Sequence, residues 1–235
     1  MKDGKMKFPC ELARLCGLLL VAFSVCLFVR SGYGTTVISS IPLMLSYAFP
    51  ELDFGTWNII YQLILIGLCI LMTRKASGSY AFSVVVALVF SFFLNFMKAL
   101  LADIPKSTEL DLIYIVLAHI LLFFGVSFFM RCYLPLLPVD IFIRDAVITY
   151  RIKYRIVKTA FDVSCIAISA VICWLSLGKI VDIGIGTIVS ACVTGYFVAF
   201  ITTKIYDRFF EFVPATRLAA RFLSDDAPCK TKAEA

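Results

Sequence analysis

The amino-acid sequence predicts an all-α, polytopic membrane protein with six transmembrane helices, built as two inverted three-helix repeats with short half-helices. Of its residues, 61% are hydrophobic and 16% are charged, and the mean hydropathy is +0.95. Soluble domains have about 45–50% apolar and about 25% charged residues. A chain of 235 residues cannot bury so much apolar surface in its own core, so the composition favours a lipid bilayer as the surrounding solvent.

Six segments of the chain are apolar and approach the length that a membrane span needs. A hydrocarbon core of about 30 Å is crossed by a helix of about 20 residues. We place transmembrane helices at residues 11–29, 56–72, 80–101, 110–133, 159–177 and 184–204. The lysines before the first segment are typical of a signal peptide, but no small-residue cleavage site follows, so we predict an uncleaved first helix.

The apolar sequence contains a repeated octet. FSVCLFVR at residues 23–30 returns about a hundred residues later as FGVSFFMR at residues 124–131. A segment rich in helix breakers follows each copy, SGYGTTVISSIP at 31–42 and CYLPLLPVDIFIRD at 132–145. Interrupted segments at matching positions of two halves indicate a binding site in transporter-like proteins.

Further matches extend the repeat. Trp57 and Asn58 open the second predicted helix as Phe161 and Asp162 do the fifth. Each half has an odd number of spans, so the second half enters the membrane from the opposite face and the repeat is inverted. We divide the chain into a first repeat at 1–106, a second repeat at 107–210 and a C-terminal tail at 211–235, with half-helices at about 34–49 and 138–149.

Lysine and arginine alternate between the loops. The basic-rich side carries the tail and Lys2, Lys5, Lys7, Arg14, Arg74, Lys75, Arg131, Arg144, Arg151, Lys153, Arg155 and Lys158. The opposite side carries Arg30, Lys98, Lys106 and Lys179. Cytoplasmic loops are enriched in these residues, so we predict a multi-pass protein of the cell membrane with both termini in the cytoplasm.

The first break offers a binding site at the start of a half-helix. Gly34 lets the backbone turn, and Thr35 and Thr36 are suitable caps for the helix that follows. A helix N-terminus presents unpaired N–H groups and a partial positive charge, which favour an anionic or polar group. The alternative is an ordinary loop that ends in a short interfacial helix.

The second break carries charge. Pro138 suits the first position of a helix, and Asp140 then lies one turn before Arg144. Ionisable residues at membrane depth are costly, which makes Asp140 and Asp162 candidate carriers of a proton or cation. The alternative pairs Asp140 with Arg144, and Asp162 with Lys158, at the cytoplasmic surface.

Other polar and small residues complete the candidate solute-binding set. Asn58 and Gln62 lie one turn apart, where they either line a polar cavity or bond between helices. Gly186 and Thr187 open the last predicted helix, where close helix packing is the alternative to anion binding. The full set is Gly34, Thr35, Thr36, Ser39, Ser40, Asn58, Gln62, Pro138, Asp140, Arg144, Asp162, Gly186 and Thr187.

Four segments carry a family resemblance: GYGTTVISSIPLMLSYAFPELDFGTWNIIYQ, LPVDIFIRD, FDVSCIAIS and IGIGTIVSACVTG. Through them the chain resembles the YczE/YyaS/YitT family of bacterial integral membrane proteins, over roughly residues 12–203. The resemblance implies a bacterial cytoplasmic-membrane protein with several spans, and it implies no particular biochemical activity.

Composition and motifs argue against several classes of function. The net charge of +6 follows from the loop lysines and arginines, and no basic–aromatic nucleic-acid module is present. The nine cysteines form no CxxC pair and the chain has one histidine, so we expect no metal site and no cofactor. The sequence lacks HExxH, GxSxG and clustered carboxylates, so we expect no enzymatic activity.

We therefore predict a small permease that moves an unidentified small solute, with ion or proton coupling as an option. The alternative is a membrane scaffold or regulator that binds a partner, or anionic lipid, through the basic loop at residues 144–158 and the tail. The expected partners are the lipid bilayer, the solute, and a second copy of the chain or a cytoplasmic protein.

Overall fold

The structure is a computed structural model, and it describes residues 6–74, 78–101, 107–131, 137–178, 184–206, 208 and 210–213. In chain order its elements are β1 (Met6–Pro9), α1 (Cys10–Ser31), α2 (Val37–Ala48), α3 (Phe54–Thr73), α4 (Gly78–Leu100), α5 (Thr108–Arg131), α6 (Pro138–Tyr150), α7 (Tyr154–Leu177), α8 (Ile185–Ile201), the π-helical turn η1 (Thr202–Tyr206) and β2 (Phe210–Val213). The prediction of an all-α, multi-pass membrane protein is confirmed at this level.

Five helices, α1, α3, α4, α5 and α7, are long and apolar enough to cross a membrane. They correspond to five of the six predicted spans. The sixth corresponds to α8, whose α-helical part has 17 residues before it continues as η1. A helix that crosses the hydrocarbon core needs about 20 residues. A sixth span through α8 and η1 therefore stays a prediction.

Two short helices, α2 and α6, lie at the positions of the predicted half-helices, and their role as half-helices in a membrane stays a prediction. Gly32 ends α1 in the left-handed conformation, with φ +70°, and Pro138 stands in the first turn of α6. Thr36 occupies the N-cap position of α2, but its side chain makes no capping hydrogen bond. The start of α2 therefore does not depend on the hydroxyl cap that the sequence suggested.

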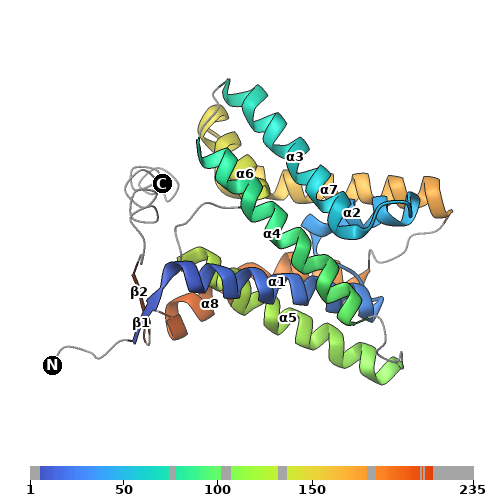
Figure 1. Cartoon of the computed structure of the whole chain (residues 1–235), viewed down its shortest axis with the longest axis horizontal. Helices are drawn as coiled ribbons and strands as arrows, with labels where there is room; N and C mark the ends of the chain where they lie inside the picture. Colours follow the sequence, from blue (N-terminus) through green and yellow to red (C-terminus); the bar gives the residue numbers. More distant parts are fainter. Residues whose placement is uncertain are drawn as a thin grey trace.

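The long helices α1 and α5 pack along each other (Figure 1). Helices of the two halves exchange partners around this pair, because α2 packs against α7 and α6 packs against α3. In addition, α4 flanks α1 and α8 flanks α5. Each half-helix thus lies against a long helix from the other half of the chain, and it also contacts the helix that follows it in sequence.

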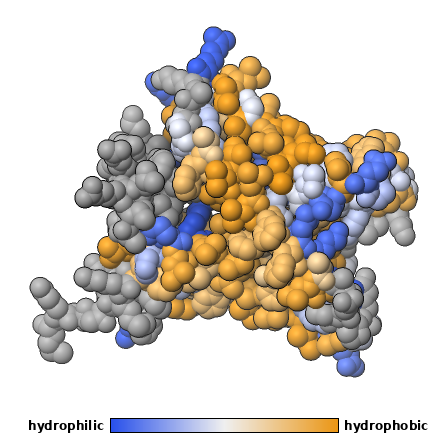
Figure 2. Space-filling view, viewed as in Figure 1, coloured by the Kyte–Doolittle hydropathy of each residue, from blue (hydrophilic) through white to orange (hydrophobic). Residues whose placement is uncertain are grey.

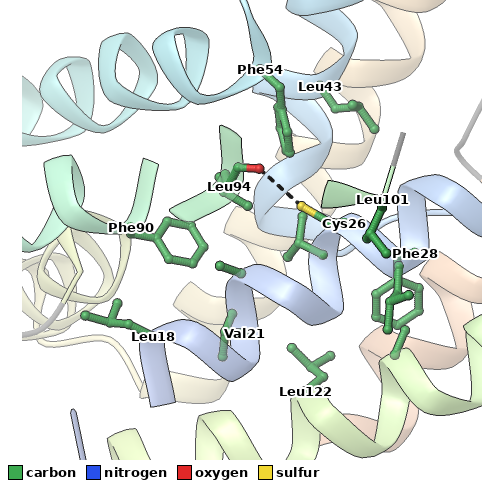
Figure 3. Packing of buried hydrophobic residues seen from close by; sticks show 14 of the residues in the cluster. Leu18, Val21, Cys26, Phe28, Leu43, Phe54, Phe90, Leu94, Leu101 and Leu122 are labelled. Atoms are coloured by element: carbon green, nitrogen blue, oxygen red, sulfur yellow. Dashed lines mark hydrogen bonds between the residues drawn. The ribbon is translucent and has the colours of Figure 1, made fainter. Parts of the chain in front are cut away.

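Two apolar clusters form most of the core. The larger one consists mainly of residues from α1, α4 and α5, with Leu43, Met44, Phe54 and Cys173 added from α2, α3 and α7. In it the Cys26 thiol donates a hydrogen bond to the Leu94 carbonyl oxygen at 3.4 Å (Figure 3). The second, which we call the four-helix cluster, joins α2, α3, α6 and α7. Its buried members are Val37, Ile41, Tyr61, Leu65, Val139, Ile143 and Cys165.

Much of the outer surface is apolar (Figure 2). Leu71, Phe92 and Leu175 expose 74%, 66% and 78% of their surface. In water, contiguous apolar surface of this kind is unfavourable, whereas the acyl chains of a bilayer solvate it. The surface therefore agrees with the membrane environment that the composition predicts.

The two ends of the described chain meet in a small parallel sheet that the sequence analysis did not predict. Met6 pairs with Phe210, and Pro9 pairs with Val213. The segment before α1 therefore lies beside the segment after η1. Several residues of the orientation argument, namely Lys2, Lys5, Lys75, Lys106, Lys179 and the tail after Val213, lie outside the described residues.

Candidate functional site

The segment before α2 and the first turn of α8 lie against each other. We call Tyr33, Gly34, Thr35, Gly186 and Thr187 the α2–α8 junction. The Gly186 N–H donates to the Tyr33 carbonyl oxygen at 3.0 Å, and the Thr35 N–H donates to Thr187 Oγ1 at 3.1 Å, across 152 positions of sequence. The structure thus brings together four residues that the sequence analysis selected at two separate places.

Glycine permits this approach of two backbones. A Cβ atom on Gly34 would lie 2.7 Å from the backbone nitrogen and from Oγ1 of Thr187, and the φ of Gly34 is +143°, which side chains disfavour. A Cβ atom on Gly184 would lie 2.6 Å from the Tyr33 carbonyl oxygen. The helix-packing role that the sequence offered for the glycines of GIGT at residues 184–187 therefore fits their contacts.

The two threonine side chains of the junction are deeply buried. The side chains of Thr35 and Thr187 are both 0% exposed. Thr187 Oγ1 accepts the backbone bond from Thr35, but Thr35 Oγ1 has no hydrogen-bond partner among the described residues. A buried polar atom without a partner is uncommon and costs roughly 1–3 kcal/mol, so this hydroxyl requires an explanation.

A second site surrounds the first turn of α6, and we call Arg14, Asp140, Lys158 and Asp162 the α6 charged site. Lys158 Nζ lies 2.6 Å from Asp162 Oδ1, which is the one-turn pairing that the sequence offered as the alternative role of Asp162. Burial raises the pKa of the Asp140 carboxyl, while the Arg14 guanidinium and the Lys158 ammonium oppose this shift. Asp140 therefore belongs to the same charged neighbourhood as the Lys158–Asp162 pair.

Arg144 pairs with Asp145, whereas the sequence alternative paired it with Asp140. Arg144 Nε lies 3.2 Å from Asp145 Oδ1, and the Tyr80 hydroxyl donates to Asp145 Oδ2 at 2.6 Å. Asp145 is buried and was not in the candidate set, although it stands in the same IFIRD segment. The buried tyrosine and the arginine together compensate its charge and attach α6 to α4.

Polar pairs also connect helices outside the two sites. Ser40 Oγ on α2 and Ser169 Oγ on α7 are 2.7 Å apart, and the Asn58 amide donates to Ser91 Oγ at 2.8 Å. Gln62 is buried, and its Oε1 has no partner among the described residues. Asn58 therefore has the interhelical bond that the sequence gave as one of two options, and Ser169 is a partner that the sequence analysis missed.

The remaining candidates are placed by their helices. Ser39 is buried on α2, and Pro138 is buried at the start of α6. Thr36 is also buried, at the N-cap of α2. Among the described residues no group of three or more histidine, cysteine, aspartate or glutamate side chains is arranged to hold a metal ion. The candidate set thus divides between the α2–α8 junction, the α6 charged site and the helices that separate them.

Comparison with known proteins gives a family without an assigned activity. A family profile with the description "Family of unknown function (DUF6198)" matches residues 11–203, which extend from α1 through α8. No curated protein and no solved structure matches the chain. The more specific resemblance to the YczE/YyaS/YitT family stays a prediction.

Proposed function

The chain belongs to the family described as DUF6198, and from its geometry we propose that it is a small multi-pass transporter that moves a small solute across a bilayer. The observation that carries this proposal is the reciprocal packing of the two halves of the chain. An inverted repeat produces such packing. In many transporters, one repeat rocks against the other around a site near the middle of the membrane.

If α1 to α4 correspond in order to α5 to α8, most helix–helix contacts occur in pairs that the repeat relates. The α2–α7 and α6–α3 contacts form one couple, α1–α4 and α5–α8 a second, α2–α3 and α6–α7 a third, and α4–α6 and α8–α2 a fourth. The α1–α5 contact corresponds to itself. The α3–α4 contact departs from the rule, because the described parts of α7 and α8 do not pack to the same extent.

Contacts of the repeated octet follow the same relation. Cys26 and Ser127 are the fourth residues of the two octets. The Cys26 thiol donates to the Leu94 carbonyl oxygen at 3.4 Å, and the Ser127 hydroxyl lies 3.4 Å from the Val198 carbonyl oxygen in addition to its bond within α5. Corresponding side chains thus reach from α1 to α4 and from α5 to α8.

The contact between α1 and α5 agrees with a pseudo-two-fold axis that relates the two halves of the chain. A Cβ atom on Gly17 would lie 3.1 Å from the Gly125 carbonyl oxygen, and a Cβ atom on Gly125 would lie 3.1 Å from that of Gly17. The octets begin at residues 23 and 124, an offset of 101 that relates Gly17 to Ala118 and Gly125 to Ser24. Ser24 Oγ donates to the Ala118 carbonyl oxygen at 2.8 Å, so the related positions are also in contact.

The four-helix cluster contains a contact that corresponds to itself. Trp57 and Phe161 differ by 104 positions, and the same offset relates Tyr61 to Cys165. The Tyr61 hydroxyl and the Cys165 sulfur are 3.5 Å apart. A residue that touches its own counterpart lies near the pseudo-two-fold axis. We therefore place the centre of the rocking motion, and the path of the solute, in the four-helix cluster between the α2–α8 junction and the α6 charged site.

Access to Ser40 from the two faces of the membrane tests this proposal without knowledge of the solute. Ser40 is 0% exposed and pairs with Ser169 across α2 and α7. In a chain whose native cysteines are replaced by alanine, we expect the Ser40→Cys thiol to react with a membrane-impermeant reagent in right-side-out and also in inside-out vesicles. Alternating access exposes the same position to each face in turn.

Two further positions calibrate the reaction. Leu71→Cys, on the apolar outer surface, is expected to react from neither face. Thr108→Cys, exposed at the start of α5, is expected to react rapidly from one face. Reaction of Ser40→Cys from one face only, or from neither, would contradict the transporter proposal.

A regulatory or scaffold function is the alternative, and the exposed turn between α6 and α7 favours it. Tyr150, Ile152 and Tyr154 are 62%, 41% and 45% exposed, and the exposed Arg151 and Lys153 alternate with them. Aromatic and basic residues in this arrangement suit a membrane–water interface with anionic headgroups. Under this alternative, Arg151→Glu with Lys153→Glu abolishes function, whereas Ser40→Cys is silent to thiol reagents.

A further inference from the structure

We propose that the α2–α8 junction binds a small monovalent anion, held by the Thr35 hydroxyl and by the backbone N–H groups of the first turn of α2, beside the positive end of the α8 dipole. The inference names the substrate class for the transport site, so its physiological meaning rests on the proposed function. The binding itself does not require transport and is tested separately.

The first argument is the meeting of two helix N-termini. The bonds from Gly186 to Tyr33 and from Thr35 to Thr187 place the first turn of α8 beside the residues that enter α2. Each N-terminus is equivalent to about half a positive charge. Neither helix has an acidic residue in its first turn or a side-chain hydrogen bond at its N-cap. Two like partial charges are therefore in contact without a negative group from these turns.

The second argument is the unpartnered hydroxyl. Thr35 directly precedes the N-cap of α2, and its backbone N–H already touches Thr187 of the other helix. Its hydroxyl group is therefore attached where the two helix ends meet. It is 0% exposed, and Oγ1 has no partner among the described residues. A hydroxyl donates one hydrogen, and an anion at this position would accept it.

The third argument comes from the corresponding position in the other half. The offset of 101 residues relates Ser39 in α2 to Asp140 in α6. α6 has this aspartate in its first turn, so the chain itself supplies a negative group to that helix N-terminus. In α2 the corresponding residue is a neutral serine. An anion from solution would supply at α2 the charge that Asp140 supplies at α6.

The composition of the junction limits the ligand to a small anion of single charge. Its five residues are neutral, and a Cβ atom on Gly186 would lie 2.8 Å from Ile115 Cδ1, which indicates tight surroundings. A phosphate or sulfate dianion in such a dry site would require cationic side chains to offset its loss of hydration. Chloride, bromide, nitrate and a single carboxylate group fit the donors and the charge.

The experiment measures binding by thermal unfolding of the purified full-length protein in lipid nanodiscs. Chloride, bromide and nitrate are titrated against gluconate at constant ionic strength. We expect Tm to rise with a saturable dependence on each anion, because a ligand that binds the folded state stabilises it. Thr35→Val keeps the shape of the side chain and removes the hydroxyl, and we expect it to weaken the apparent Kd at least about tenfold.

A matched threonine serves as the control. Thr202 also has an Oγ1 atom without a partner among the described residues, but it lies at the C-terminal end of α8. Thr202→Val is expected to leave the anion response unchanged. If Thr35→Val does not fold, anomalous scattering from bromide in crystals of the wild-type protein locates the ion directly. The absence of a saturable anion effect, an equal effect in Thr35→Val, or bromide elsewhere would overturn the inference.

The outcomes for binding and for transport are distinguishable. Saturable binding together with a Ser40→Cys thiol that reacts from one face only would leave the anion site and remove the transporter proposal. A thiol that reacts from both faces without anion binding would leave the transporter and remove the anion as its substrate class. Chloride efflux from proteoliposomes that Thr35→Val slows would support both.

Discussion

The α2–α8 junction and the α6 charged site begin the two half-helices of the molecule, and they differ in how charge is handled. At α2, two helix N-termini meet around neutral threonines and close-packed glycines, and the Thr35 hydroxyl is left without a partner among the described residues. At α6, Asp140 stands in the first turn, and the charges of Arg14 and Lys158 act on it. The two starts are therefore similar in backbone and opposite in electrostatics.

The difference teaches that related positions can keep a packing role while their chemistry diverges. Under the proposed repeat, Cys26 corresponds to Ser127 and Tyr61 to Cys165, and their contacts are similarly placed. Ser39 and Asp140, which the octet offset of 101 relates under the same proposal, differ in charge. We infer that the N-terminus of α2 is arranged to receive a negative charge from a ligand, whereas the N-terminus of α6 has the negative charge of Asp140.

The loss of charge at α6 is expected to have the largest effect. Asp140→Asn and Asp162→Asn should each reduce chloride efflux from proteoliposomes at least about tenfold, because they remove the ionisable groups that couple the motion. Circular dichroism and gel filtration check that both variants stay folded. Glu109→Gln, at the exposed start of α5, serves as the control. Wild-type efflux in both aspartate variants would remove the coupling role and with it half of the comparison.

The next largest difference between the two sites is the cost of adding or changing a side chain where the backbone begins each helix. Gly34→Ala places a Cβ atom 2.7 Å from Thr187 at φ +143°, so we expect a loss of about 2–4 kcal/mol of stability in chemical unfolding. Pro138→Ala, at the start of α6, should cost less than about 1 kcal/mol. Gly67→Ala, in the interior of α3 with no atom within 4 Å of the new Cβ, should stabilise by up to about 1 kcal/mol. If Gly34→Ala is as stable as Pro138→Ala, the close approach of the two backbones at Gly34 does not require glycine.

The tyrosine bond at α6 gives an intermediate effect. Tyr80→Phe removes the 2.6 Å hydrogen bond to buried Asp145, and bonds to charged groups contribute about 1.5–3 kcal/mol. We expect a loss within this range in chemical unfolding. Tyr150→Phe, at an exposed position of α6, should change stability by less than about 0.5 kcal/mol. If the two variants unfold alike, the compensation of Asp145 by Tyr80 is not what stabilises α6.

The smallest expected difference between the two sites is the dependence of stability on pH. Burial raises the pKa of Asp140 above its ordinary value of 3.8, so its favourable contribution is present below that value and is lost as the pH rises through the folded-state pKa. The stability of Asp140→Asn relative to wild type should therefore increase with pH over this interval. Thr35→Val changes no ionisable group, and its relative stability should stay constant there. A flat profile for Asp140→Asn, from unfolding at a series of pH values, would contradict the assignment.

Several features of the fold were predictable because they depend on local chemistry. Gly32 and Pro138 mark where α1 ends and α6 begins, since glycine and proline have restricted or unusual backbone preferences that act within one turn. The pairing of Lys158 with Asp162 follows from one-turn spacing on a helix. The octet was visible because its side chains are similar in both copies.

Other features were not predictable because they depend on contacts between distant segments. The Tyr33 carbonyl contributes a backbone atom to the α2–α8 junction, and a backbone atom leaves no pattern in the sequence. Tyr61 and Cys165 are chemically dissimilar and 104 positions apart, so no sequence pattern indicated their contact. Ser169 and Asp145 acquired roles because helices from the other half bring Ser40 and Tyr80 to them.

The sequence by itself indicated the membrane environment, most of the long helices and the positions of the short helices α2 and α6. These properties are sums of hydropathy and backbone preference over neighbouring residues. Only the tertiary structure decided that Thr35 meets the start of α8, that Tyr80 reaches Asp145, and that the Thr35 hydroxyl is left without a partner among the described residues. Such outcomes depend on which of many distant polar groups are brought within about 3 Å of each other, and that choice is made by the packing of whole helices.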